Sequence, residues 1–197
     1  MDKPATTKFD IHPLLTKRWS PRAFSRQPVE REKLQRIFEA ARWSPSASNE
    51  QPWSFIIGFE GDETFKLIFD SLVEFNQLWV KTAPIIVVAV GRQLSSKSGK
   101  PNAYYRYDVG QALAHLTIQA TSEGLFVHQM GGFDAKQLSG SFEIPEDHEA
   151  ITVFTIGYQG DYKELHPNHQ KLELADRTRK SQEDFIYSGK FGVKLSI

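Results

Sequence analysis

Residues 83–91 read APIIVVAVG and form the longest apolar run in the chain. Within it, residues 85–90 are an unbroken stretch of mostly β-branched side chains, which is typical of a strand covered on both faces of a sheet. The run is far shorter than the roughly 20 apolar residues that a helix needs to cross a bilayer. We therefore expect the central strand of a globular domain here.

Patterned segments on both sides of this run predict helices and further strands. Before it, apolar residues at helical spacing predict helices over residues 30–43 and 61–72. After it, residues 105–123 predict a long helix, which Gly124 would end. Shorter apolar runs predict strands at residues 53–58, 126–130 and 151–158. Because helices and strands alternate irregularly, we expect an α+β fold with helices packed on both faces of a mixed sheet.

The length of 197 residues indicates one domain over residues 1–197, since domains usually hold roughly 100–200 residues. Residues 91–102 and 159–171 are polar and irregular, but neither stretch is long enough to separate two cores. The C-terminal part of the chain lacks a clear core pattern, so we expect it to wrap over another part of the structure.

Composition excludes several classes of protein. The chain has no cysteine, which excludes a disulfide framework, a thiolate metal site and a cysteine nucleophile. Lys plus Arg and Asp plus Glu both number 24, a balance that gives no field to gather nucleic acid or an anionic membrane surface. The N-terminus lacks the apolar segment of a signal peptide. We expect a cytoplasmic protein with no nucleic-acid or membrane partner.

Familiar catalytic motifs are absent from the sequence. It has no dinucleotide-binding G-x-G-x-x-G, no phosphate loop and no G-x-S-x-G nucleophile elbow. His166 and His169 lie three residues apart, but Pro167 separates them and no acidic cluster joins them. We expect both to be solvated loop histidines and predict no metal site.

The stretch RWSPR, residues 18–22, is the first positive signal. It places two guanidinium groups and a hydroxyl within one short turn, and Pro21 stiffens that turn. Guanidinium forks and a hydroxyl suit a phosphate dianion. From these residues alone, a solvated basic turn remains the alternative.

The stretch PSASNEQPW, residues 45–53, is the second signal. Small hydroxyls, an Asn and a Gln stand between two prolines, which restrict the backbone around them. Such a loop can bind the edge of a polar heterocycle. A helix-to-strand connection rich in turn-forming residues is the alternative.

Together these stretches resemble the flavin-dependent nitroreductase family. Each piece is weak alone, whereas their order and spacing are specific, and the resemblance covers about residues 11–192. The matching pieces are RWSPRAF (18–24), AARWSPSASNEQPWSFII (40–57), NQLWVKTAPIIVVAV (76–90), YDVGQALAHLTIQATSEGL (107–125), MGGFD (130–134), IPEDH (144–148) and ITVFTIGYQG (151–160).

The resemblance implies an α+β fold with FMN at the interface of an obligate homodimer. It also implies that NAD(P)H reduces the flavin, and that a nitroaromatic, quinone-like or related small molecule then takes the electrons in a ping-pong reaction. A reductive dehalogenase, a flavin-fragmenting enzyme and a low-turnover flavin-binding protein remain alternatives. Since the flavin would carry the chemistry, no side chain is expected to act as nucleophile, acid or base.

The same resemblance gives the first half of the chain its expected contacts with FMN. Arg18 and Ser20, with Trp19 between them, would serve the phosphate and ribityl end. Arg22 would lie near the N1–C2=O edge of the ring, where a cation stabilises reduced flavin. The loop residues expected to contact the cofactor, partly across the dimer interface, are Pro45, Ser46, Ala47, Asn49 and Gln51.

Later segments supply the remaining expected contacts. Asn76 would face the pyrimidine side of the ring, and the loop Met130, Gly131 and Gly132 would approach flavin N5. Arg177 and Arg179 would bind the phosphate, with Lys180 as the alternative to Arg179. The aromatic residues that either line the substrate pocket or simply pack are Trp79, Tyr104, Tyr105 and Tyr107. Some family members carry a basic residue at the position of Trp79, so the flavin potential here would be lower.

Overall fold

The structure is a computed structural model that describes residues 1–195. Its sheet has the strand order β1-β2-β4-β3. The strands are β1 (Trp53–Phe59), β2 (Ile85–Arg92), β3 (Phe126–Met130) and β4 (His148–Gly157). All three pairings are antiparallel, so the predicted mixed sheet is wrong. An unbroken apolar run shows that both faces of a strand are covered, but it carries no information about the direction of the neighbouring strands.

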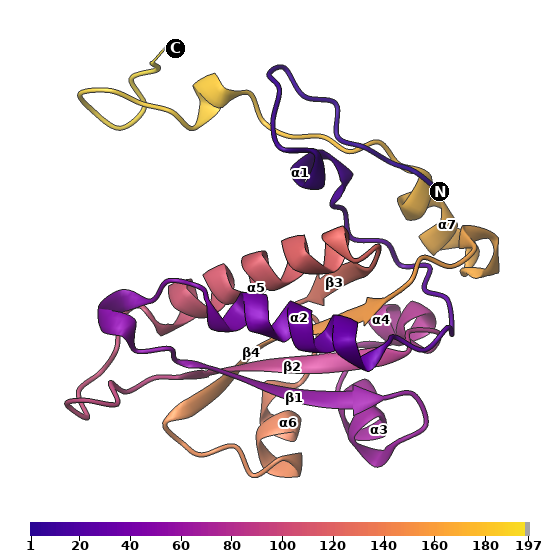
Figure 1. The fold of residues 1–197 in the computed structure, drawn as a ribbon, viewed down its shortest axis with the longest axis horizontal. Helices are drawn as coiled ribbons and strands as arrows, with labels where there is room; N and C mark the ends of the chain where they lie inside the picture. The colour runs from indigo at the N-terminus through magenta and orange to yellow at the C-terminus, as the bar shows by residue number, and fades with distance from the viewer. Residues whose placement is uncertain (196–197) are drawn as a thin grey trace.

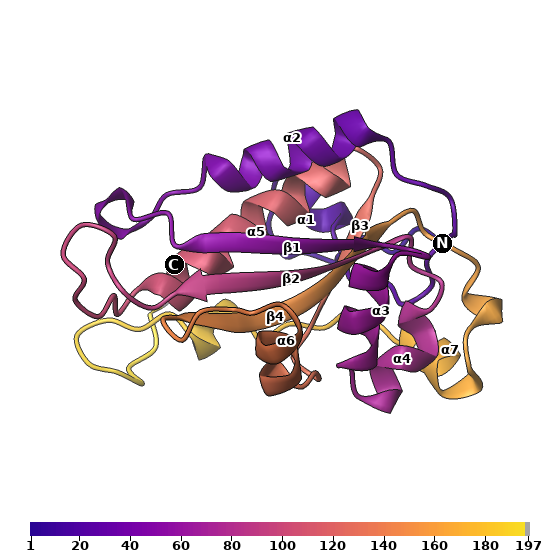
Figure 2. The ribbon, with the colours of Figure 1, turned by 90° about the horizontal axis from the view of Figure 1, so that it is seen from below.

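Helices cover both faces of the sheet, as predicted (Figures 1 and 2). One face carries α2 (Arg31–Arg42) and α5 (Tyr105–Ser122). The other carries α3 (Glu63–Asp70), α4 (Glu74–Val80) and α6 (Ala135–Ser141). The sequence analysis predicted the helix before it over residues 61–72 but no helix over residues 74–80, so α4 was missed.

Strand β2 explains why residues 85–90 are apolar at every position. Ile86, Val88 and Val90 point into the core cluster on the α3 side of the sheet. Ile85, Val87 and Ala89 point into the cluster on the α5 side. Side chains alternate between the two faces of a strand, so both sets must be apolar in a sheet covered on both sides. Both clusters lie against this one sheet. The single domain over residues 1–197 stays a prediction, and its last two residues lie outside the described part.

Helix α5 ends where the sequence predicts. Gly124 has φ +76°, a left-handed conformation that glycine adopts without steric cost, and its N–H donates to Thr121 O. The N–H of Leu125 then donates to Ala120 O, which satisfies another carbonyl at the helix end. The helix therefore stops cleanly before β3.

The N-terminal segment and the stretch that follows α7 lie outside these layers (Figure 1). Helix α1 (Pro13–Lys17) and the residues before it run beside the segment that follows α7 (Pro167–Leu174). Short 3-10 turns occur at η1 (Ala47–Asn49), η2 (Tyr162–Glu164) and η3 (Gln182–Asp184). Over the described residues, no helix is both long and apolar enough to cross a membrane.

Candidate functional site

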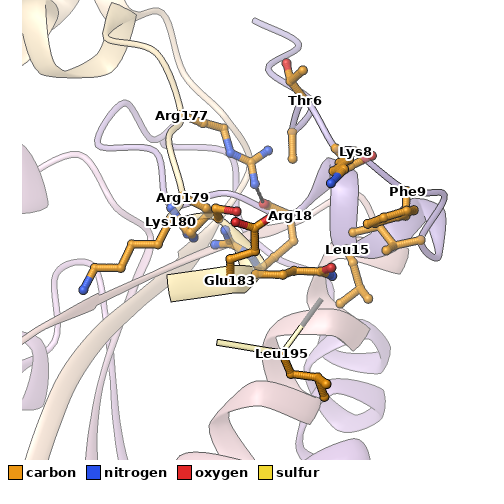
Figure 3. A pocket seen from close by; sticks show the side chains of 15 residues that line it. Thr6, Lys8, Phe9, Leu15, Arg18, Arg177, Arg179, Lys180, Glu183 and Leu195 are labelled. Atoms are coloured by element: carbon orange, nitrogen blue, oxygen red, sulfur yellow. Dashed lines mark hydrogen bonds between the residues drawn. The ribbon is translucent and has the colours of Figure 1, made fainter. Parts of the chain in front are cut away.

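A cavity of about 690 Å³ lies between the N-terminal segment and the C-terminal tail (Figure 3). The charged side chains that line it are Lys8, Arg18, Arg177, Arg179, Lys180 and Glu183. Arg18 follows α1, whereas Arg177 and Arg179 follow α7, so the fold brings together basic residues about 160 positions apart in sequence. This gathering of cations makes the cavity suitable for an anion.

Arg18 lies in this cavity with other cations close by. Burial lowers the pKa of its guanidinium, and the positive charges of Arg177 and Arg179 lower it further. One of its terminal nitrogens, Nη1, lies 3.4 Å from Ser20 Oγ, so two of the predicted contacts are adjacent. Like charges held together at a half-buried position favour binding of a counter-anion.

Arg177 has a structural contact that the sequence did not predict. Its Nη1 donates to Lys3 O and to Thr16 O, both at 2.8 Å, and its Nη2 donates to Arg18 O at 2.7 Å. These bonds engage three of the five N–H donors of the guanidinium. Arg177 thus ties the tail to the N-terminal segment, while Arg179 and Lys180 remain exposed at the cavity.

Several buried polar atoms near Arg22 lack a hydrogen-bond partner within the described residues. They are Arg22 Nε, Trp79 Nε1 and both ring nitrogens of His169. Arg22 and His169 are close enough for the Arg22 charge to lower the pKa of His169, after the larger effect of burial. Buried donors are nearly always paired in folded proteins, so these atoms indicate a missing polar partner.

Trp79 lies in the core of this chain and not on an open surface. It is 1% exposed, and its ring packs between Phe24 and His128, at centroid distances of 6.1 and 4.5 Å. Burial lowers the pKa of His128 to about 4, so this histidine is neutral near pH 7. Neither ring therefore supplies the cation that some family members have at this position.

Asn76 and Gly132, two predicted site residues from distant segments, are in contact. Asn76 Nδ2 donates to Gly132 O at 3.1 Å. A Cβ atom at position 132 would lie 2.8 Å from Val73 Cγ2, so only glycine allows this approach. Gly131 beside it is exposed with open space around it, and Met130 is buried. The structure thus sets the predicted Met130–Gly132 loop against the start of α4.

The loop of residues 45–52 has an unusual backbone. Ser48, Asn49 and Gln51 have φ values of +51°, +54° and +48°, in the left-handed region that non-glycine residues seldom adopt. Its anchors are bonds from Gln51 N to Ser46 Oγ at 3.0 Å and from Ala47 N to Asp108 Oδ2 at 3.1 Å. Such strain persists only where the surroundings impose it, and it clusters at functional sites.

The contacts of this loop come from nearby residues at the same end of the sheet. The carboxylate of Glu50 accepts bonds from Ser95 Oγ at 2.6 Å and from Ser96 N at 2.8 Å, and these bonds lower its pKa to about 2. In both ribbon views the loop lies at the end of the sheet away from α7. Within the described residues, no hydrogen bond joins it to Arg18, Arg22 or Asn76.

The three tyrosines of the predicted substrate group differ in their surroundings. Tyr104 and Tyr107 are 60% and 68% exposed. The hydroxyl of Tyr105 donates to Glu149 Oε2 at 2.5 Å, and burial together with this carboxylate raises the pKa of the tyrosine. Tyr105 is thus held within its own chain, whereas Tyr104 and Tyr107 can meet another molecule.

Sequence reasoning missed two residues of helix α7. Both His169 and Glu173 are fully buried, whereas His169 was expected to be solvated. Glu173 accepts from the N–H of Arg22, and the His169 ring lies 4.5 Å from that of Phe75. The stretch around them read as irregular because its buried positions are polar and its leucines are exposed. No periodic apolar signal was therefore present to indicate a helix.

The Nitroreductase family model matches residues 15–74 and 58–158 of this chain, so the chain belongs to the nitroreductase family. A crystal structure described as an oxidoreductase containing FMN is 32% identical, covers 96% of both chains and superposes with a TM-score of 0.90. A nitroreductase family protein from Streptococcus pneumoniae TIGR4, 18% identical over 88% of this chain and 96% of its own, shares the fold with a TM-score of 0.71.

A curated relative gives the same result. The Archaeoglobus fulgidus protein named "Putative NADH dehydrogenase/NAD(P)H nitroreductase" is 28% identical over 153 residues, which are 76% of this chain and 85% of its own. The predicted family, its α+β fold and an oxidoreductase class are thus confirmed. The family model ends at residue 158, before the segment that carries Arg177 and Arg179.

Proposed function

We propose that this chain is an FMN-dependent oxidoreductase that takes electrons from NAD(P)H and passes them to nitroaromatic, quinone-like or related small molecules. Family membership and a 32%-identical structure described as containing FMN support the cofactor. The relative named for NAD(P)H supports the electron donor. The observation that carries the proposal is the basic cavity around Arg18 in a chain of this family. A cytoplasmic location stays a prediction from the sequence.

The residues present fit FMN at both of its ends. Arg18, Arg179 and Lys180 line one cavity and would hold the phosphate. Arg22 and Trp79 have buried N–H donors that find no partner among residues 1–195, and such donors suit the polar edge of a flavin ring. When bound, FMN would supply the hydride chemistry that no side chain of this chain offers.

The chain's own residues would bind, orient and shield the cofactor. Arg22 would place a positive charge beside the ring and so favour its reduced, anionic form. The contact between Asn76 and Gly132 would hold the Met130–Gly132 loop in place. Tyr104 and Tyr107 would line the acceptor pocket, because their rings are exposed.

A homodimer is part of this proposal. Phe185, Phe191 and Val193 in the C-terminal tail are 59%, 94% and 53% exposed, and a second copy of the chain would cover them. The loop of residues 45–52 holds exposed polar side chains in a strained backbone and would complete the partner's site. Sedimentation over a dilution series tests this proposal: a monomer that keeps FMN would contradict it.

The first test is the absorption spectrum of the purified protein. We expect a yellow protein with about one FMN per chain, identified by extraction and chromatography. A colourless protein that takes up no added FMN would overturn the proposal.

Initial rates with NAD(P)H and acceptor both varied test the reaction. Parallel double-reciprocal lines are expected, because a single pocket over the ring would make the donor leave before the acceptor binds. Intersecting lines would mean a ternary complex. If NAD(P)H bleaches the flavin but no acceptor is reduced, a specialised family member or a flavin carrier is the better assignment.

A further inference from the structure

Helix α7 has the reverse of the usual burial pattern of a surface helix: its leucines are exposed and two of its polar side chains are buried. Leu172 and Leu174 are 44% and 51% exposed, whereas His169 and Glu173 are each 0% exposed. A helix on a protein surface normally buries its apolar residues and exposes its charged ones. This inversion means that the contacts of the buried polar face must offset the cost of its burial.

The carboxylate of Glu173 makes those contacts with the segment that carries the predicted flavin contacts. The Arg22 N–H donates to Oε1 at an N···O distance of 3.0 Å and to Oε2 at 2.9 Å, and the Ala23 N–H donates to Oε1 at 3.1 Å. No basic side chain forms an ion pair with Glu173 within the described residues. Two backbone amides thus hold a fully buried carboxylate through hydrogen bonds to a charged acceptor, which are stronger than bonds between neutral groups.

Arg177, four residues further along the chain and beyond the end of α7, binds the same segment with the opposite polarity. Glu173 accepts from backbone N–H groups at Arg22 and Ala23, while Arg177 donates to the backbone carbonyls of Thr16 and Arg18. The two side chains therefore hold residues 16–23 at both ends. This anchored segment carries Arg18, Trp19, Ser20 and Arg22, the residues predicted to contact the cofactor.

We propose that Glu173 is a positioning residue that fixes the backbone of Arg22 so that its guanidinium meets the flavin ring; this inference rests on the proposed function. The main-chain bonds determine where the Cα atom of Arg22 lies. The Arg22 Nε atom is buried and has no partner in the described structure, so its direction depends on that backbone. The guanidinium would act on the ring, and Glu173 would act only through Arg22.

Glu173→Gln tests the proposal in the FMN-loaded protein. The amide replaces one acceptor oxygen by a donor, which then faces the N–H of Arg22 and loosens the segment. We expect the dissociation constant for FMN to rise about tenfold, within the range of coupling between contacting residues. We expect the midpoint potential of bound FMN to fall, because the cation moves away from the reduced ring.

The sign of the potential change separates positioning from a direct charge effect. If Glu173 acted on the ring only as a negative charge, its removal would raise the potential and overturn the proposal. Glu173→Asp keeps the charge but withdraws the oxygens by one methylene, so a lower potential in this variant supports positioning. This variant also keeps the test available should Glu173→Gln fail to fold.

A double-mutant cycle with Arg22→Ala tests whether Glu173 acts through Arg22. In the Arg22→Ala protein, Glu173→Gln should change the FMN dissociation constant less than about twofold. An equal loss of affinity in both backgrounds would mean that Glu173 serves the fold alone and would overturn the proposal. Glu164→Gln, an exposed glutamate just before α7, is the matched control and should bind FMN as the parent does.

Failure of this inference differs from failure of the proposed function. If the parent chain takes up no FMN, the proposed function is wrong, and the inference falls with it. If the parent and Glu173→Gln bind FMN with equal affinity and equal potential, only the inference is wrong. Melting temperatures of all variants show whether a loss of affinity merely reflects a less stable fold.

Discussion

The segment of residues 16–23 and the loop of residues 45–52 are both predicted to contact the cofactor, yet the chain holds them differently. The first is bound by Glu173 and Arg177, and its buried Arg22 Nε atom has no hydrogen-bond partner in the part of the chain that the structure describes. The second is fastened by its own neighbours, in left-handed conformations, with Asn49 and Gln51 exposed. The first segment thus keeps a buried donor without a partner among the described residues, while the second exposes its polar side chains at the surface.

Arg18→Ala should have the largest effect, because it removes a cation from the first segment. Loss of one partner of a buried charged contact costs about 2–5 kcal/mol, or roughly 30-fold to several-thousand-fold in FMN affinity. The melting temperature should change far less, because the half-buried Arg18 side chain forms one long bond, of 3.4 Å to Ser20 Oγ, among the described residues. Titration of the apoprotein with FMN is the measurement. Arg31→Ala, at an exposed position, is the control. An unchanged FMN affinity in Arg18→Ala would mean that Arg18 belongs to a solvated basic turn and does not bind the cofactor.

Acid should weaken the packing behind the first segment, where His128 Nδ1 lies 2.8 Å from Pro21 O. Burial lowers the pKa of His128 from 6.5 in the unfolded chain to about 4. Between these pH values the unfolded chain binds more protons, so the free energy of unfolding falls by about 3 kcal/mol as the pH drops from 6.5 to 4. Above pH 6.5, His128 is neutral in both states, and its full contribution to the free energy of unfolding is present.

Urea unfolding at pH 8 and pH 5 measures the change in the free energy of unfolding with pH, in the parent and in His128→Gln. The variant cannot titrate at this position, so its free energy of unfolding should depend less on pH. If the free energy of unfolding depended equally on pH in both proteins, His128 would have the same pKa in the folded and the unfolded chain, and the prediction would be wrong.

Asp108→Ala tests the second segment, whose Ala47 N–H donates to the buried Asp108 carboxylate. A buried donor left without its acceptor costs about 1–3 kcal/mol, so the free energy of unfolding should fall by that amount. If the loop completes a partner's site, FMN affinity should fall as well; if the loop is only a connection, affinity should stay unchanged. Asp176→Ala, at an exposed position, is the control.

The sequence predicted the parts of the fold that leave a periodic apolar pattern. The apolar positions of β2 and the end of α5 at Gly124 follow from side-chain alternation and from the left-handed preference of glycine. Strand direction left no such pattern, and the sheet proved antiparallel. Helix α7 was missed because its buried face is polar.

The candidate site shows the same limit. Basic and polar residues within short motifs, such as Arg18 with Ser20, were readable from their spacing. The bonds of Glu173 and Arg177 were not, because each joins a side chain to backbone atoms about 150–160 positions away. Backbone groups are the same in every residue, so a sequence carries no mark of which amide or carbonyl a distant side chain will bind.

Ser48→Gly should have the smallest effect, and its sign is informative. Ser48 adopts φ +51°, where a side chain costs up to about 1–2 kcal/mol and glycine costs little. Glycine also makes the unfolded chain more flexible, so we expect a net gain of no more than about 1 kcal/mol in the free energy of unfolding. Ser98→Gly, also exposed but without a positive φ, should instead destabilise the protein slightly.

Denaturant unfolding of both variants measures the sign of each change in the free energy of unfolding. FMN titration then shows whether relief of strain loosens the loop that the partner's site would use. A gain in stability with weaker FMN binding would support a functional role for the strain, whereas a loss of stability in Ser48→Gly would show that the left-handed backbone costs the loop nothing.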